Sequence, residues 1–284
     1  MYIAISIILR ILSNSLSNVY QKQLAQDGFN PFFINFVMYT GLTLLMLPIA
    51  CKINFINLGL VCWGAAVLGG LCGALGNSYL VKALKSGELS VLGPINAYKS
   101  VVAMIFGIFL LKEIPSVYGI MAVFLIIAGS YFVFDTQEEG FSFRLLKRAD
   151  IRYRFYALIF TAVEAVFIKE VINNSDIVTS FVLWCFFGML FTGLSVVRTG
   201  KIRAISHNSV WSKLLMIIVL MGIMQLSTNY VFSHIQVSYG LAFFQLSALL
   251  SVIFGWKYFN ETHIRKKLIG TFIMIAGAIL LILA

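Results

Sequence analysis

Two opposite charges inside long apolar segments are the residues best placed to do chemistry. Lys99 lies in the segment from about Leu89 to Leu111, and Glu164 lies in the middle of the segment from about Tyr153 to Ile172. A charge within a membrane helix costs roughly 2.5–3.5 kcal/mol on insertion scales, so it normally faces a partner or a wet cavity. The two residues could bind substrate, titrate together in proton coupling, or form a static salt bridge. Lys99 could also snorkel toward the membrane interface.

Uncharged polar side chains recur at helical spacing in the same kind of segment. Asn14 and Asn18 are four residues apart, as are Gln225 and Asn229, so each pair shares one face of a helix. Each group alone could simply bond to a neighbouring helix, but their convergence favours a polar cavity. The candidate substrate-binding residues are Lys99, Glu164, Asn14, Asn18, Asn96, Asn77, Tyr79, Asn229, Gln225, Gln245 and Ser247.

The composition places these residues in a membrane protein. The chain has 284 residues, of which 60% are hydrophobic and 11% charged, and its mean hydropathy is +0.94. Soluble domains have about 45–50% apolar and about 25% charged residues. The solid apolar runs of about 20 residues predict an all-α protein that crosses the lipid bilayer many times. The net charge of +10 comes largely from short loops, so we expect no nucleic-acid partner.

The apolar runs predict ten transmembrane helices joined by loops too short to form soluble domains. The expected helices cover approximately residues 2–21, 31–50, 58–84, 89–111, 116–134, 153–172, 177–197, 212–235, 241–259 and 264–283. Residues 135–150 form the longest and most charged loop. Any function must therefore reside within the helical bundle.

The chain contains an internal repeat with an offset of 148 residues. This shift places Gly107 on Gly255, Glu113 on Glu261, and Ala128-Gly129 on Ala276-Gly277. The predicted units are residues 1–134 and 151–284, joined by the linker 135–150. Because each unit has five helices, the second must enter the membrane from the opposite face. We therefore expect two inverted repeats around a central cavity, which is a transporter architecture.

The distribution of basic residues predicts the orientation of the chain. Most lysines and arginines, among them Lys22, Arg154 and Lys267, fall in the loops after the first, third, fifth, seventh and ninth expected helices. The positive-inside rule assigns these odd-numbered loops to the cytoplasm and both termini to the outside.

The repeated motif resembles the EamA domain of the drug/metabolite transporter superfamily. The first copy includes Gly93-Pro94-Ile95, Gly107, Leu111-Lys112-Glu113, Gly119 and Ala128-Gly129, and the second includes Gly255, Glu261, Gly270 and Ala276-Gly277. The resemblance covers the whole chain and implies a basket of ten helices that transports small metabolites. The second copy lacks the usual proline within Tyr239–Ser247. Glu113 and Glu261 lie at corners, where we expect each to cap the helix that follows rather than bind substrate.

The sequence predicts a multi-pass inner-membrane secondary transporter that works by alternating access. Its substrate would be a small polar or amphipathic metabolite, with proton coupling as an option, and the charges allow an anion or a zwitterion such as an amino acid. A lipid or polyprenyl-phosphate flippase subunit is the alternative. An intramembrane enzyme is less favoured, because there is no nucleophile–base set. The four cysteines have no metal-ligand spacing, so we expect no metal and no cofactor. Substrate, direction, coupling ion and oligomeric state are left open.

Overall fold

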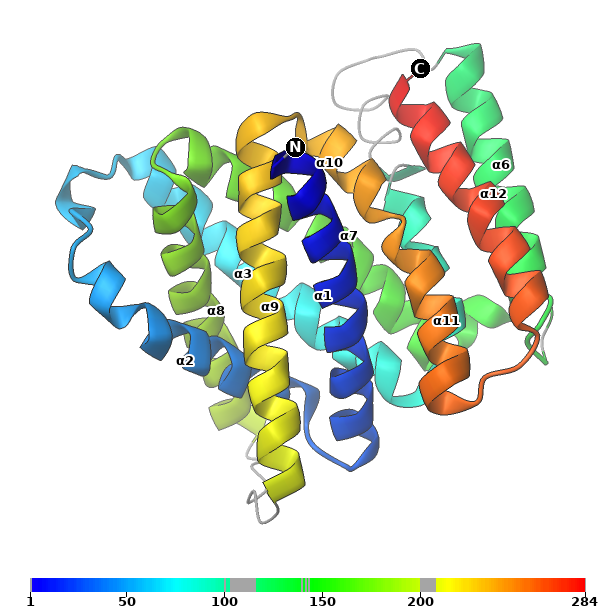
Figure 1. The fold of residues 1–284 in the computed structure, drawn as a ribbon, viewed down its shortest axis with the longest axis horizontal. Coiled ribbons are helices and arrows are strands. Elements are labelled where there is room, and N and C mark those ends of the chain that lie inside the picture. Colours follow the sequence, from blue (N-terminus) through cyan, green and yellow to red (C-terminus); the bar gives the residue numbers. More distant parts are fainter. Residues whose placement is uncertain are drawn as a thin grey trace.

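The computed structural model describes residues 2–99, 101–102, 116–138, 140, 142, 144–199 and 208–283. All regular secondary structure in these residues is helical, in agreement with the expected all-α class (Figure 1). The last part of the expected helix 89–111 and the motif residues Gly107 and Glu113 lie outside the described residues.

The described helices follow the expected order. The α-helices are α1 (Tyr2–Gln26), α2 (Pro31–Ala50), α3 (Leu60–Ser86), α4 (Leu89–Leu92), α6 (Val117–Phe134), α7 (Ala149–Asn173), α8 (Ile177–Thr199), α9 (Asn208–His234), α10 (Val237–Phe244), α11 (Ser247–Phe259) and α12 (Ile264–Leu283). The short 3₁₀ helices are η1 (Phe55–Asn57), η2 (Pro94–Ala97) and η4 (Leu145–Lys147).

Local sequence signals start and stop several of these helices. Asn30 caps α2 by accepting a hydrogen bond from the amide of Phe32, and Pro31 stands at the first helical position, where its missing N–H is harmless. Ser116 caps α6 in the same way, through the amide of Gly119. At the other end of the chain, α11 stops at Asn260, whose φ of 54° turns the chain toward α12.

Two expected helix ends were wrong because charged residues continue the helices beyond the apolar runs. The first helix extends past Gln21 to Gln26, and the sixth begins at Ala149 rather than Tyr153. Lys22 and Arg154, which we assigned to loops, therefore lie inside α1 and α7 and are buried. Both side chains form the hydrogen bonds or ion pairs described below, and these contacts offset the cost of burying a charge.

Two expected helices were wrongly predicted to be continuous. The segment that starts at Leu89 leaves the α-helical path at Leu92 and passes through η2, which begins with Pro94. The segment near the C-terminus begins at Val237, not Leu241, and breaks between α10 and α11 at Gln245-Leu246. Pro94 accounts for the first break because it lacks an N–H. The 148-residue shift places Gln245-Leu246 on Ala97-Tyr98, at the end of η2, so the two breaks lie close to each other in the repeat.

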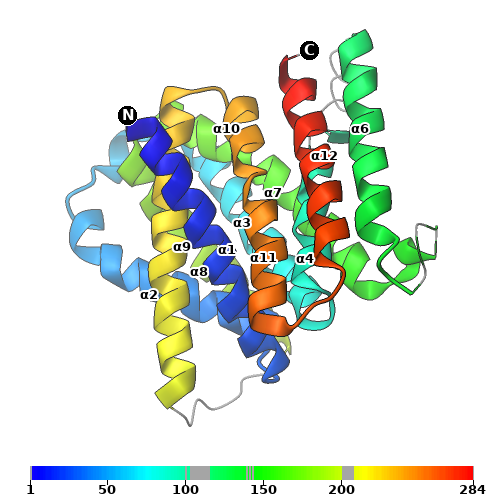
Figure 2. The ribbon, with the colours of Figure 1, turned by 45° about the vertical axis from the view of Figure 1, so that its right-hand side comes forward.

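Each long helix of one half packs on a helix of the other half. In both views α6 lies beside α12, while α2 lies near α8 at the opposite side of the molecule (Figures 1 and 2). Helix α1 packs on α9 and α3 packs on α7. Because the shift relates α1 to α7 and α3 to α9, these two contacts are equivalent to each other with the halves exchanged.

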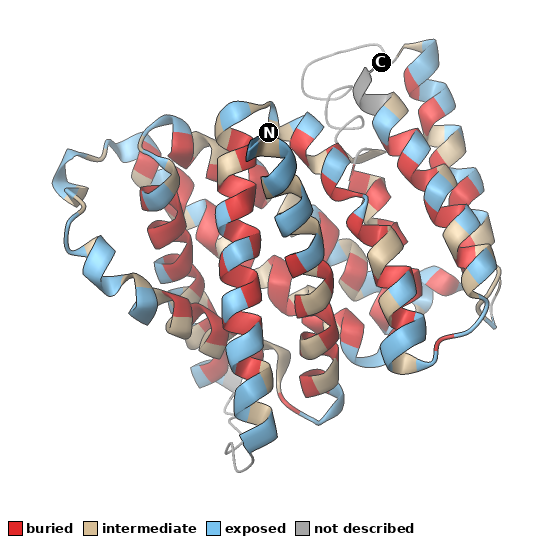
Figure 3. Ribbon diagram, in the orientation of Figure 1, coloured by how far each residue is buried: buried red, intermediate tan, exposed pale blue. Residues whose placement is uncertain are grey.

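The burial pattern is that of a bundle in a membrane. Buried residues face the interior of the bundle, and the outer faces expose many large apolar side chains (Figure 3), such as Leu44, Phe124 and Phe272. Seven helical stretches among the described residues are long and apolar enough to cross a membrane. The protein is thus a multi-pass membrane protein, while ten crossings remain a prediction. Helix α7 is not among the seven, and it carries charges that prove central to the site.

The contact between α6 and α12 depends on two glycines. A Cβ atom on Gly129 would lie 2.6 Å from the carbonyl oxygen of Gly270, and one on Gly270 would lie 2.5 Å from the oxygen of Gly129. Small residues of this kind let membrane helices approach each other closely. Backbone atoms cannot move aside as a flexible side chain can, so either side chain would separate the helices.

We predict that Gly129→Ala lowers the stability of the protein by about 1–3 kcal/mol, the usual range for overpacking. The measurement is the melting temperature of the full chain in detergent, which is obtained from the loss of the monodisperse species on heating. Gly64→Ala is the matched control, because no atom lies within 4 Å of a Cβ there. Alanine also favours a helix by up to about 1 kcal/mol, so the control should melt at or slightly above the wild-type temperature. Equal melting of the two variants would contradict the packing role of Gly129.

Candidate functional site

A polar cavity of about 100 Å³ lies between the two halves of the bundle. Helices α1 and α3 and the broken α4–η2 segment line it from the first half, and α7, α9, α10 and the start of α11 line it from the second. The charged residues in its lining are Arg10, Lys99, Arg154 and Glu164.

Eight of the eleven candidate residues line this cavity, and three do not. The eight are Lys99, Glu164, Asn14, Asn18, Asn77, Asn96, Gln225 and Ser247. Tyr79 is two residues from Asn77 and so points to a different side of α3, where its ring stacks on Tyr153 and Phe160.

Asn229 and Gln245 are buried outside the cavity lining, where their side chains form hydrogen bonds with other residues. Asn229 accepts a hydrogen bond from the Nε2 of Gln225 at 2.9 Å and donates to the carbonyl of Ile177 at 3.3 Å, so it ties α9 to α8. The Oε1 of Gln245 accepts a hydrogen bond from the Nδ2 of Asn96 at 3.1 Å. That bond joins the two helix breaks across the halves.

The Lys99 ammonium faces the cavity without a partner in the described part of the chain. Lys99 lies in the helical turn after η2, and only 8% of it is exposed. It donates no hydrogen bond to another described residue and forms no ion pair with Glu164. The two charges share one cavity but do not touch, so a static salt bridge does not account for either of them here.

Glu164 is positioned by an aromatic side chain and a glycine. Its Oε1 accepts a hydrogen bond from the Nε1 of Trp184 at 2.7 Å, and the Trp184 ring packs edge to face on Tyr39. A Cβ on Gly73 would lie 2.3 Å from that same oxygen, so only glycine leaves room for the carboxylate. Tyr39 in turn accepts a hydrogen bond from Asn77, which also lines the cavity.

Two arginines complete the charged lining. Arg10 of α1 has its guanidinium carbon 4.1 Å from the centre of the Phe244 ring. Its Nε and Nη1 atoms are buried and have no hydrogen-bond partner among the described residues.

Arg154 was not among the candidate residues because it lies at the very start of the expected helix 153–172 and was counted with the basic loop residues. Its Nε donates to the carbonyl of Leu92 at 2.7 Å and its Nη2 to the Oδ1 of Asn96 at 2.9 Å. A signal was present in the sequence, since the cavity-lining residues of α7 recur at steps of three or four, apart from the neighbours Glu164 and Ala165. These residues are Arg154, Ala157, Thr161, Glu164, Ala165 and Ile168.

Polar side chains satisfy the backbone groups that the helix breaks release. The amide of Asn96 bonds to the carbonyl of Gly93 instead of that of Leu92, which leaves the Leu92 oxygen for Arg154. At the second break, Ser247 donates to the carbonyl of Phe244 at 2.7 Å. Ser15 of α1 adds a bond between the halves by donating to the carbonyl of Ser247, the first residue of α11, at 3.2 Å. Irregular backbone inside a membrane protein requires such partners.

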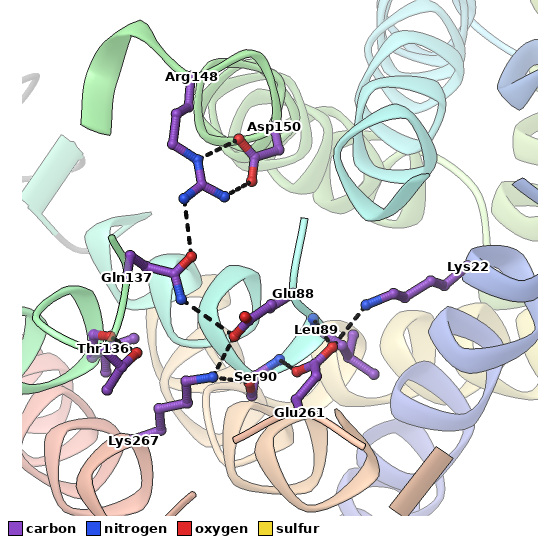
Figure 4. A network of polar contacts seen from close by, with 11 residues as sticks. Lys22, Glu88, Leu89, Ser90, Thr136, Gln137, Arg148, Asp150, Glu261 and Lys267 are labelled. Carbon is purple, nitrogen blue, oxygen red and sulfur yellow. Dashed lines mark hydrogen bonds and ion pairs between the residues drawn. The ribbon is translucent and has the colours of Figure 1, made fainter. Parts of the chain in front are cut away.

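A second group of charges joins the two halves at the end opposite the termini (Figures 1 and 4). We call it the corner cluster, and it consists of Lys22, Glu88, Gln137, Arg148, Asp150, Glu261 and Lys267. Lys22 and Glu261 form an ion pair at 2.7 Å in which both side chains are about 5% exposed or less. Lys267 pairs with Glu88 and donates to the hydroxyl of Ser90.

The expected role of Glu261 needs a correction. It does not cap α12, the helix that follows it, but accepts hydrogen bonds from the amides of Leu89 (2.7 Å) and Ser90 (2.8 Å) at the start of α4. Burial raises the pKa of this carboxyl, but the Lys22 ammonium and the hydrogen bonds from Lys22 and Ser90 outweigh it, so the pKa lies below the usual 4.5. Glu261 therefore caps a helix of the other half as an anion.

Comparisons with known proteins agree with this geometry. A helical membrane protein with a charged cavity between two halves is of the kind expected for a solute transporter. The profile of the EamA-like transporter family matches residues 1–135 and again residues 152–283, so the chain belongs to that family. It is a membrane transporter of the drug/metabolite type, and members of this family are transporters rather than enzymes.

One solved structure supports the fold alone. It is described as "Crystal structure of protein", shares 14% sequence identity and superimposes with a TM-score of 0.68, covering 98% of this chain and 95% of that one. A search of curated proteins found no match.

We predict that Glu261→Gln destabilises the protein at neutral pH, by an amount that approaches the roughly 3–5 kcal/mol typical of a broken buried ion pair. Because the folded-state pKa is lowered, the stabilisation by Glu261 is present above about pH 4.5 and is lost as the pH falls through the lowered pKa. The melting temperature of the wild type should thus fall more steeply toward acid than that of Glu261→Gln. Lys213→Gln, which breaks the more exposed pair with Asp27, is the control and should change little. Parallel acid profiles would contradict the assignment.

Proposed function

We propose that this protein is a secondary-active transporter of the inner membrane that moves a small polar metabolite by alternating access. The observation that carries the proposal is the cavity between the halves, into which both halves direct charged side chains beside two broken helices. Binding sites near the midplane at broken helices are typical of transporters built from repeats. The charged lining favours a polar solute over a lipid chain.

The packing of the helices supports an inverted repeat of residues 1–134 and 151–284, linked by 135–150. Helix α1 contacts α9 and α3 contacts α7, which is the arrangement expected when two equivalent units face each other across a twofold axis. In such a protein, rocking of one unit against the other exposes a fixed central site to each side in turn.

The corner cluster supports a gate at one end of this path. It joins α1 and α4 to the α11–α12 corner, and so connects the first half to the second. The charge distribution of the loops assigns this end to the cytoplasm. Opening toward the cytoplasm would then require separation of Lys22 from Glu261 and of Lys267 from Glu88.

Glu164 is the residue that we propose to carry the coupling proton. It is a buried carboxyl group inside the cavity, and its partner Trp184 is neutral, so gain or loss of a proton changes the charge that the substrate meets. Carboxyl groups within membrane helices often serve proton relays.

We predict that Glu164→Gln loses accumulation driven by a pH gradient but keeps exchange of substrate across the membrane, because glutamine preserves the shape of the side chain and cannot titrate. The measurement is uptake of amino acids, sugars, organic acids and purines into proteoliposomes, with and without a pH gradient, followed by counterflow for each solute taken up. Glu170→Gln is the matched control, since Glu170 lies on the same helix and its carboxylate accepts a hydrogen bond from nearby Asn174.

Two outcomes would contradict these proposals separately. If wild-type proteoliposomes take up none of the solutes above the level of protein-free liposomes, the transport proposal fails. If Glu164→Gln responds to the pH gradient as the wild type does, Glu164 is not the coupling group.

A further inference from the structure

The charges that line the central cavity do not balance. Its described lining contains three basic side chains, Arg10, Lys99 and Arg154, and one acidic side chain, Glu164. The formal charge of the lining is therefore +2.

None of these four charges is neutralised by an ion pair within the part of the chain that the structure describes. Lys99 is 8% exposed and has no hydrogen-bond partner among the described residues, where two buried nitrogen atoms of Arg10 also lack one. In the same residues, Arg154 donates to neutral oxygens on Leu92 and Asn96, and Glu164 accepts from the neutral indole of Trp184. The corner cluster differs sharply, because there a buried lysine meets a buried carboxylate.

An uncompensated buried charge is unfavourable, and the penalty falls when a ligand of opposite sign enters. Guanidinium groups bind carboxylate and phosphate groups through charge-assisted hydrogen bonds, often two at a time. The guanidinium of Arg10 and the ammonium of Lys99 are donors of this kind. Both residues line the same cavity, so one small ligand can meet both.

The remaining lining suits the body of a polar solute. Apolar side chains such as Leu80, Ile168 and Met224 form much of it. Neutral amides and hydroxyls from both halves also line the cavity, and they can bond to hydroxyl or carbonyl groups of a ligand. These residues are Asn14, Asn18, Asn77, Thr161, Gln225 and Thr228. Arg154 is held by the broken α4–η2 segment and so contributes charge from a fixed position.

We propose that the cavity binds a small organic dianion, whose acidic groups contact Lys99 and Arg10. This inference rests on the proposed function, since it takes the cavity to be the transport site. A ligand with two negative charges cancels the formal +2, whereas a zwitterion or a neutral sugar leaves it unchanged. Dicarboxylates and phosphate monoesters share this chemistry.

The test uses probes of nearly equal size and different charge. Full-length protein in lipid nanodiscs is melted with succinate (two negative charges), succinamate (one) and succinamide (none), at equal ionic strength. Glycerol 3-phosphate and glycerol form a second series that separates phosphate esters from carboxylates, and inorganic sulfate controls for nonspecific anion effects. We expect succinate or glycerol 3-phosphate to raise the melting temperature more than its less charged analogue and more than sulfate.

Variants then assign the effect to the cavity. Lys99→Gln should weaken binding of the protecting dianion at least tenfold, and Lys99→Arg should retain most of it because the charge is kept. Arg10→Gln should weaken binding as well. Lys257→Gln, an identical change at an exposed position of α11, should bind as the wild type does. The melting temperature without ligand shows whether each variant is folded.

The inference is overturned if succinamide or glycerol protects as well as its charged analogue, or if Lys99→Gln and Lys99→Arg both bind the dianion with wild-type affinity. Protection by sulfate equal to that by both organic dianions would also overturn it. Binding of the ligand is measured in an assay that does not depend on transport. A result can therefore contradict the dianion site without contradicting the transporter, and the reverse. A dianion that binds but is never transported counts against the transporter alone, and transport of a neutral solute without dianion binding counts against the dianion site alone.

Discussion

Backbone groups inside a membrane must find hydrogen-bond partners within the protein, and the centre of this bundle is arranged around that requirement. Both halves interrupt a helix beside the cavity, and each interruption frees peptide groups that lipid cannot bind. The carbonyl of Leu92 is met by Arg154 of the second half, and that of Phe244 by the nearby hydroxyl of Ser247. Because Arg154 comes from the other half, the need to satisfy the backbone at the first break also helps to hold the two halves together around the cavity.

The same requirement explains why so much polarity gathers in one place. The bond between Asn96 and Gln245 links the two breaks, and Arg154 reaches both Leu92 and Asn96. A charge that stabilises a broken helix is thereby brought into the lining of the cavity. Structural and binding roles are consequently shared by the same side chains, and a substitution at Asn96 or Arg154 would alter both.

Much of this organisation could be predicted from the sequence because it follows from periodicity and composition. The apolar runs predicted the positions of the helices, and the 148-residue repeat predicted two halves that the family profile matches separately. Charges and polar groups within apolar runs pointed to eight of the twelve polar residues in the described cavity lining. Such signals are local, since each depends on a residue and its neighbours along one helix.

Features that depend on contacts between distant segments could not be predicted in this way. The breaks at Leu92 and Gln245 were missed because apolar runs lie on both sides of each, although Pro94 is a local signal for the first. Arg154 resembled a loop residue until Leu92 supplied its partner, 62 positions away. Glu261 was expected to cap the helix next to it, yet it caps α4, because a turn in the fold brings the two corners together.

That cap has a consequence for how the chain is built in the membrane. The first two amides of α4 enter the membrane with the first half of the protein. The carboxylate that accepts their hydrogen bonds lies about 170 residues later in the chain. Until the α11–α12 corner is synthesised, α4 has an open end and Lys22 has no anion to face. The first half therefore cannot form all of its native contacts during biogenesis until the α11–α12 corner, one of the last segments to be synthesised, has entered the membrane.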